Sequence, residues 1–192
     1  IVMLRKDFNR LEKVLRKMES KEYVYQSISS DVEYTNLYTK FRKRQGVVYS
    51  KSKRNKLLKY RGHFVDIFVI EKTSYFAARA SKVVYYNLQH TTTYIRTKWL
   101  RHMMIRTIEG FCLYLINPLL RLIGLINPRG EYHYMLGQGW PKHTFFMKDT
   151  MPLSKAKFEG YEFPVPKDMD AYLTNVYGNW RKLPNDNYIK RC

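Results

Sequence analysis

The sequence predicts a protein of the α+β class. Short runs rich in β-branched and aromatic residues occur in the first third, a long helical stretch follows, and Pro, Gly and aromatic residues become frequent after residue 137. The chain has 192 residues, of which 45% are apolar, so its length suits one domain with a sizeable core. We expect a single domain over 1–192, with a sheet-forming part over 1–74, a helical insertion over 75–136 and a C-terminal region over 137–192.

The first elements follow from the spacing of apolar residues. Apolar side chains in residues 7–19 recur at spacings of three and four, which predicts an amphipathic helix with Asp7 as its N-cap. Residues 1–4 are expected to end a strand that precedes this helix. The β-branched and Tyr residues of 23–28 predict a second strand, followed by a turn through residues 29–31.

A basic block of ten Lys and Arg residues covers residues 40–61. Lys40, Arg42 and Arg44 alternate along the chain, which on a strand puts their side chains on one face. Such a face can hold phosphate oxygens. We expect residues 51–59 to be a solvated loop.

One carboxylate, Asp66, interrupts the apolar run of residues 63–70, which predicts a mostly buried strand. Buried, ionised carboxylates are usually paired or metal-bound, because burial without a partner is costly. Two interpretations therefore stay open: a ligand in a metal site, and a structural carboxylate that is hydrogen-bonded to a loop or to an Arg side chain. One carboxylate alone does not make a magnesium site, so any further ligand must come from elsewhere in the fold.

Residues 75–126 are expected to be largely helical, with two Asn-Pro pairs near their end. The most apolar part, residues 111–126, is shorter than the roughly 20 residues that a transmembrane helix needs. We favour a core helix here. The alternative is a helix lying in a membrane interface, which the nearby basic residues would support.

The C-terminal region is predicted to open with a hairpin or extended segment over residues 158–166, because prolines bias their predecessors away from helix. Asp168 is then the expected N-cap of a short helix over residues 169–176, and Gly178 is expected to end it.

The charge of the chain is +19 at neutral pH and is unevenly spread. Residues 34–130 hold nineteen Lys or Arg but only three acids. Such a surface attracts polyanions: nucleic acid, an anionic membrane face or phosphorylated small molecules. The two cysteines exclude a disulfide framework and a four-ligand zinc site of the usual kind, and the sequence contains no phosphate-binding or hydrolase signature motif.

Several segments carry a resemblance to one family. Residues 158–166, with the Tyr-Leu and Tyr-Gly-Asn-Trp sequences that begin at Tyr172 and Tyr177 and the Leu183-Pro184 pair, resemble the closing signature of the LicD family. This family comprises the phosphocholine transferases of bacterial surface glycans and relatives such as the fukutin-type proteins. Residues 2–8 are similar to the segment that follows the family's acidic motif. Residues 62–68 are similar to its hydrophobic-Asp-Ile-Phe strand, whereas residues 75–140 match poorly.

The resemblance implies a nucleotidyltransferase-like fold, with a small mixed sheet and packed helices. It also implies Mg²⁺- or Mn²⁺-dependent transfer of a phospho-alcohol group, such as phosphocholine, from a CDP-activated donor to a sugar of a cell-surface glycan. Asp66 would be a catalytic residue and metal ligand. Lys40 and Arg42 would hold the donor phosphates, and His63 and Glu159 would line the pocket or position the acceptor.

The sequence also departs from the family pattern. The family's aspartate cluster would lie immediately before Ile1, so the chain resembles the C-terminal portion of the domain, and we expect it to be inactive alone. The family's Pro-Leu-Asp is replaced by Val69, Ile70 and Glu71, which weakens a role for Glu71.

Two binding functions without catalysis are the alternatives. One is a basic nucleic-acid-binding module, which would leave the C-terminal signature unexplained and is therefore disfavoured. The other is a module that docks on an anionic membrane through residues 99–126. Docking is compatible with transferase activity, because surface glycan precursors are built at the cytoplasmic membrane face. We therefore expect a cytoplasmic protein that acts at the inner face of that membrane.

Overall fold

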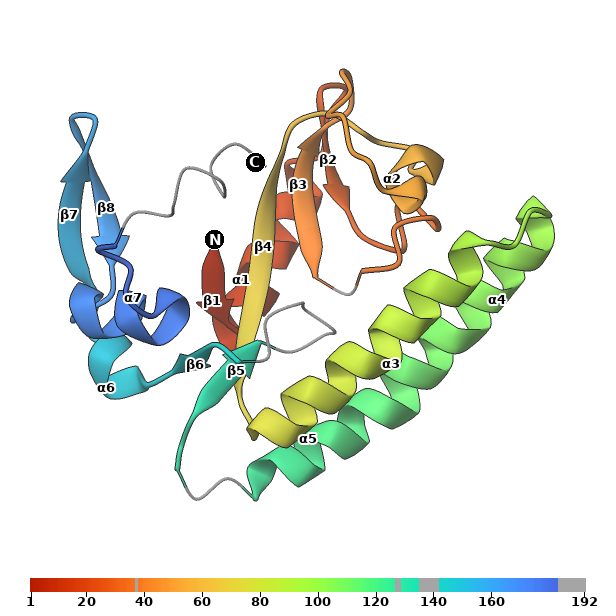
Figure 1. Ribbon diagram of the computed structural model, residues 1–192. Helices are drawn as coiled ribbons and strands as arrows, with labels where there is room; N and C mark the ends of the chain where they lie inside the picture. The colour runs from red at the N-terminus through yellow and green to blue at the C-terminus, as the bar shows by residue number, and fades with distance from the viewer. Residues whose placement is uncertain (37, 127–128, 135–141, 183–192) are drawn as a thin grey trace. The chain divides into compact units, whose positions relative to one another are not determined.

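The computed structural model describes residues 1–36, 38–126, 129–134 and 142–182. The chain divides into two compact units, Ile1–Lys142 and His143–Cys192. Strands and helices are mixed in both units, which confirms the α+β class (Figure 1).

The sheet of the first unit is built around the nine-residue strand β4 (Phe64–Lys72). Two strands pair with β4 in antiparallel fashion, β3 (Thr39–Lys43) with its first half and β5 (Tyr132–Tyr134) with its last residues. β1 (Val2–Leu4) pairs with β4 in parallel fashion, along the edge opposite to β3 (Figure 1). β2 (Tyr23–Gln26) extends the sheet beyond β3.

Helix α1 (Arg5–Lys17) supplies part of the core of this unit. The expected helix is confirmed, but the assignment of Asp7 as its N-cap is wrong. The chain passes directly from β1 into the helix, so Leu4 is the N-cap, and Asp7 lies in the first turn. A carboxylate there still favours the helix, because the helix dipole is positive at that end.

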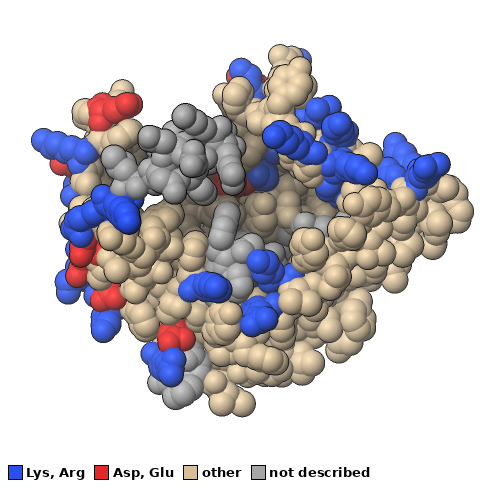
Figure 2. Space-filling view, in the orientation of Figure 1, with Lys and Arg blue, Asp and Glu red and all other residues tan. Residues whose placement is uncertain are grey.

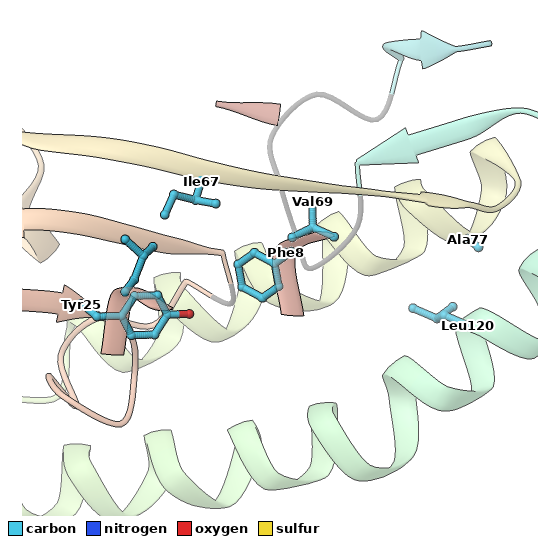
Figure 3. Close-up of a cluster of buried hydrophobic side chains, with 7 residues drawn as sticks. Phe8, Tyr25, Ile67, Val69, Ala77 and Leu120 are labelled. Atoms are coloured by element: carbon cyan, nitrogen blue, oxygen red, sulfur yellow. The ribbon is translucent and has the colours of Figure 1, made fainter. Parts of the chain in front are cut away.

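The core cluster joins the sheet, α1 and two later helices (Figure 3). Its buried members are Phe8, Leu15, Tyr25, Ile67, Val69, Ala77 and Leu120. Burial of each large apolar side chain contributes about 1.5–3 kcal/mol. Strand β4 is less buried than its composition predicts, because Phe64 and Val65 at its start are 38% and 48% exposed.

A long helical hairpin follows β4, in agreement with the expectation for residues 75–126. Its first arm is α3 (Tyr75–Thr93), which begins after Ser74; the Ser74 side chain accepts a hydrogen bond from the Ala77 amide. The second arm runs through α4 (Lys98–Phe111), the π-helical turn η1 (Cys112–Ile116) and α5 (Asn117–Leu125). Helix α5 packs closely at Gly124, where a Cβ atom would collide with Thr73.

The loop between β3 and β4 carries the short helix α2 (Lys53–Leu57) and is closed at its base. The Lys43 amide donates to the His63 carbonyl oxygen at 2.8 Å, and a Cβ atom at Gly62 would collide with the backbone oxygens of Lys43 and Gln45. Only glycine fits at this position, because two chain segments approach each other there.

The second unit contains β6 (Thr144–Phe145), α6 (Met147–Thr150), a β7–β8 hairpin (Ser154–Phe158 and Tyr161–Val165) and α7 (Met169–Tyr177). The expected hairpin or extended segment of residues 158–166 forms the turn and second strand of a hairpin that begins at Ser154, and the short helix is confirmed. Asp168 is the N-cap as expected, because its carboxylate accepts a hydrogen bond of 2.9 Å from the Ala171 amide. Gly178 ends the helix with a φ of 70°.

Candidate functional site

Strands β3 and β4 bring three of the predicted site residues together. Antiparallel pairing places Lys40 opposite Asp66 and Arg42 opposite Phe64. Lys40 and Arg42 are two residues apart on one strand, so both side chains lie on the same face of the sheet. The Lys40 Nζ atom lies 2.5 Å from the Asp66 Oδ1 atom, and the two side chains are 10% and 30% exposed.

The ring of Phe64 packs against both cations. The Lys40 Nζ atom lies 3.5 Å from the ring centroid, and the Arg42 Cζ atom lies 4.4 Å from it. Attraction between a cation and an aromatic face strengthens as the cation is desolvated, and Lys40 and Arg42 are only 8% and 4% exposed. This contact accounts for an aromatic residue at the exposed start of β4.

Arg42 is the more deeply buried of the two cations, with 4% of its surface exposed. Its Nη1 atom donates to the Gly62 carbonyl oxygen at 3.1 Å. Its buried Nε atom has no hydrogen-bond partner among the described residues. A buried donor without a partner is costly, so an acceptor supplied by a ligand would be favourable at this place.

Burial dominates the electrostatics of both cations. It lowers the pKa of the Lys40 amino group, and the hydrogen bond and charge of Asp66 offset this only in part. Burial likewise lowers the pKa of the Arg42 guanidinium group, against the opposing influence of Tyr34 and Asp66. Desolvation disfavours a cation, so a bound anion would stabilise the charged form of both groups.

A cavity of about 140 Å³ opens beside these residues. No carboxylate is among the described residues that line it, and three of them are cationic. The lining residues are Tyr34, Asn36, Tyr38, Lys40, Arg42, Val48, Asn55, Leu58, Arg61 and Phe64. Pockets for whole drug-sized ligands measure roughly 300–1,000 Å³, so this cavity suits one or two phosphate groups rather than an entire nucleotide.

The other predicted site residues lie apart from the cavity lining or in the second unit. His63 is exposed just before β4, and its carbonyl oxygen accepts a hydrogen bond from the Lys43 amide. Glu159 is exposed at the turn between β7 and β8, with a φ of 49°. Its assignment to the substrate site stays a prediction, as does that of His63.

The described residues do not by themselves fit a divalent metal ion. Across the described ranges, no three His, Cys, Asp or Glu side chains gather closely enough to hold one. Asp66, the expected ligand, is already paired with Lys40. A hard cation needs several oxygen ligands, and one ion-paired carboxylate does not meet that requirement.

Glu71 stabilises the fold rather than serving the cavity. Its carboxylate accepts hydrogen bonds from the Arg5 side chain on α1 and from the Arg121 Nε atom on α5, the latter at 2.9 Å. The pair of arginines ties the two helices to β4. The sequence-based doubt about a functional role for Glu71 agrees with this arrangement.

A second buried charge cluster surrounds Glu33, which sequence reasoning missed. The Arg101 Nη2 and His102 Nε2 atoms lie 2.7 Å and 2.9 Å from the Glu33 Oε1 atom, and Arg54 lies 3.4 Å from Oε2. Burial alone would raise the pKa of Glu33, but hydrogen bonds from Arg101 and His102 outweigh it and hold the pKa below its ordinary value. The cluster joins α4 to the loop after β2.

Comparisons of the chain with protein-family models, with curated proteins and with solved structures found no match.

Proposed function

We propose that the chain is the phosphate-binding part of a LicD-type transferase with a nucleotidyltransferase-like fold. It would bind a CDP-activated phospho-alcohol, such as CDP-choline, through the donor phosphates. The phospho-alcohol group would pass to a sugar hydroxyl of a cell-surface glycan, with cytidine monophosphate as the leaving group and the hydroxyl proton released to solvent. In phosphoryl-type transfer the protein takes little part in the covalent chemistry. It acts by positioning the reactants and stabilising negative charge.

The observation that carries the proposal is the pair of desolvated cations, Lys40 and Arg42, that line a cavity without a carboxylate. Both are held in place before any ligand binds, by Phe64, Asp66 and the Gly62 carbonyl oxygen. Pre-positioned cations lower the cost of ordering a phosphate site. Arg61 adds a third cation to the lining.

The register of β1 on β4 supports the assignment of Asp66. Val2 lies opposite Phe68, and the Ile1 nitrogen donates to the Asp66 carbonyl oxygen at 2.8 Å. In parallel strands, residues that continued β1 before Ile1 would run past Asp66. The resemblance puts the family's aspartate cluster at that place, where it would supply the carboxylates that a Mg²⁺ or Mn²⁺ ion needs.

Calorimetric titration with cytidine diphosphate, without added metal, tests the phosphate site. We expect the wild-type chain to bind it and Arg61→Gln to bind it about tenfold more weakly, because a charge-assisted hydrogen bond is lost. Lys56→Gln is the matched control: it removes the same charge from the same loop, but Lys56 is exposed and does not line the cavity. Its affinity should stay within about twofold of the wild type.

Equal weakening in the two variants would show mere attraction to a basic surface and would contradict the proposed site. A wild-type chain that does not bind cytidine diphosphate would contradict it as well. In a protein that carries an aspartate cluster directly before Ile1, Asp66→Asn should abolish transfer to the glycan while the protein stays folded. An active Asp66→Asn variant would remove Asp66 from the catalytic machinery.

A further inference from the structure

The second arm of the helical hairpin exposes apolar side chains along its whole length. These residues, called the outward stripe below, are 50–68% exposed and recur every three or four residues, except between Met103 and Phe111, where the exposed Thr107 intervenes. They are Trp99, Met103, Phe111, Leu115, Leu119 and Leu122. Large apolar side chains that stay exposed in a continuous row mark a surface that another apolar phase covers.

The opposite side of the same arm is committed to the interior of the first unit. Arg101, Ile105, Glu109 and Cys112 are buried, and the buried positions resume at Asn117 and Leu120. The step from 112 to 117 is five residues long, and the π-helical turn at Cys112–Ile116 absorbs it, because such a turn contains one residue more than an α-helical turn. The turn therefore keeps the outward stripe on one face as well.

This packing argues against a helix that crosses a membrane, although Lys98–Leu125 is long and apolar enough to do so, with a mean hydropathy of 1.5 in its most apolar window. Insertion of this helix across a membrane would remove Leu120 from the core cluster and separate Arg101 from Glu33. It would also expose the buried Glu109 and Asn117 to lipid, where unsatisfied polar groups are costly. A helix that lies in the interface keeps all of these contacts.

The charge of the hairpin indicates what the outward stripe contacts. Residues 75–126 hold seven Lys or Arg and a single acid, Glu109, which is buried. Three of the seven, Arg101, Arg106 and Arg121, are ion-paired with Glu33, Glu109 and Glu71, and the other four are exposed or half-buried and make the hairpin surface basic. Two copies of such a surface would repel each other, whereas an anionic lipid surface would attract it. Figure 2 shows the viewed face of the hairpin as largely uncharged, with Lys and Arg gathered near its upper end. Trp99 and Tyr114, which is 86% exposed, are residue types that favour the headgroup region.

We propose that the outward stripe lies in the headgroup region of an anionic membrane, parallel to its surface, and anchors the protein there. The apolar side chains enter the acyl boundary, and the Lys and Arg residues contact lipid phosphates. This proposal uses no residue of the cavity lining, so it stands or falls separately from the donor site.

Co-sedimentation with vesicles tests the proposal, using phosphatidylcholine with and without phosphatidylglycerol. We expect the full chain to bind the anionic vesicles, and Leu115→Glu/Leu122→Glu to bind them at least about tenfold more weakly. The matched control is Val14→Glu/Met18→Glu, two residues in and just after α1 that are 51% and 54% exposed. It introduces the same charge and should weaken binding by less than about threefold.

Four results would overturn the proposal. They are a wild-type chain that does not bind anionic vesicles, an equal loss in the two double variants, membrane-bound protein that resists extraction with alkaline carbonate, and a dimer in solution that only the Leu115→Glu/Leu122→Glu variant dissociates. Thermal unfolding of both variants guards against a loss that follows from misfolding.

Discussion

Lys40 and Asp66 face each other across two strands at a place that water reaches only in part. The Lys40 cation has two partners, the Asp66 carboxylate and the ring of Phe64. Removing the carboxylate leaves a desolvated cation, whereas removing the cation leaves a carboxylate that is 30% exposed and open to water. The two substitutions should therefore have unequal effects on stability.

We expect Asp66→Asn to lower the free energy of unfolding by about 1–3 kcal/mol, and Lys40→Met to change it by less than about 1 kcal/mol, because Met keeps the apolar contact with Phe64. Burial already lowers the pKa of Lys40. The penalty of Asp66→Asn should therefore shrink as the pH rises through the folded-state pKa of Lys40 and the amine becomes neutral. Urea unfolding of both variants between neutral and alkaline pH measures this, and equal penalties would contradict the asymmetry.

Glu159 occupies a backbone position that suits few residues. Its φ is 49° and that of Gly160 is 83°, as both central residues of a tight hairpin turn of the I′ type require. Glu159→Asn should raise the stability of the β7–β8 hairpin by about 0.5 kcal/mol, because Asn tolerates this conformation better. Slower amide exchange in the hairpin would show the gain. Faster exchange would indicate that the Glu159 side chain stabilises the turn by a contact of its own.

The candidate site was partly predictable from its residues. Lys40 and Arg42 alternate, and Asp66 interrupts an apolar run, so a strand pair that shares a charged face follows from the sequence. Tyr34, Asn36 and Asn55 line the same cavity but come from connecting segments. Their approach depends on how those segments fold back in three dimensions, and no local pattern encodes that.

Among the elements, the second arm of the helical hairpin is attached in part by the Glu33 cluster, through Arg101 and His102 of α4. Glu33→Gln should lower the free energy of unfolding at neutral pH by about 3 kcal/mol, because Arg101 and Arg54 would stay buried beside a neutral group. The pKa of Glu33 lies below its ordinary value. The stabilising contribution of Glu33 is therefore complete above about pH 4.5 and is lost as the pH falls through the folded-state pKa. Thermal unfolding at several pH values should show that the difference in melting temperature between wild type and variant narrows only below about pH 4.5. A difference that does not change with pH would contradict this.

The π-helical turn makes an unusual deletion tolerable. Removing Leu113 would turn the five-residue step between Cys112 and Asn117 into a four-residue step. An ordinary α-helix accommodates that step and keeps both the buried side and the outward stripe in register. Removing Thr107 from α4 would rotate Glu109 and Cys112 away from the buried side. We expect a melting temperature within a few degrees of wild type for the first deletion and a much larger loss for the second. Equal losses would show that the turn does not set the register.

Local signals predicted most elements, and their failures have identifiable causes. The turn and second strand of the β7–β8 hairpin and the Asp168 cap depend on turn and capping chemistry within a few residues, so the sequence is sufficient for them, whereas the first strand, Ser154–Phe158, was not predicted. Asp7 failed as an N-cap because the preceding strand runs without a break into α1. The π-helical turn carries no local signature at all. It results from keeping Cys112 and Asn117 on the same buried side.

At the scale of the whole molecule, the charge of +19 makes ionic strength the informative variable. A nucleic-acid-binding protein that contacts 6–10 phosphates loses roughly 10³-fold or more in affinity between about 50 and 200 mM salt. Cytidine diphosphate carries only two phosphates, so its affinity for the cavity should fall by no more than about tenfold over that range. Fluorescence titrations with cytidine diphosphate and with single-stranded RNA compare the two slopes. Tight RNA binding at low salt that falls this steeply, without binding of cytidine diphosphate, would favour the nucleic-acid alternative.

The close approach at Gly62 bears on how this protein tolerates change. The loop between Lys43 and Gly62 leaves the sheet and returns to it at nearly the same place. Its two ends are therefore held close together by the contacts at its base. Lengthening such a loop costs only closure entropy, about 0.6 kcal/mol for each doubling of its length. Substitution of Gly62, by contrast, would disturb the pairing that aligns Lys40 with Asp66. Insertions near Ser50 should therefore reshape the lining that this loop supplies, Val48, Asn55, Leu58 and Arg61, and leave the strand residues Lys40, Arg42 and Phe64 in place. The loop is therefore the natural place to alter ligand preference.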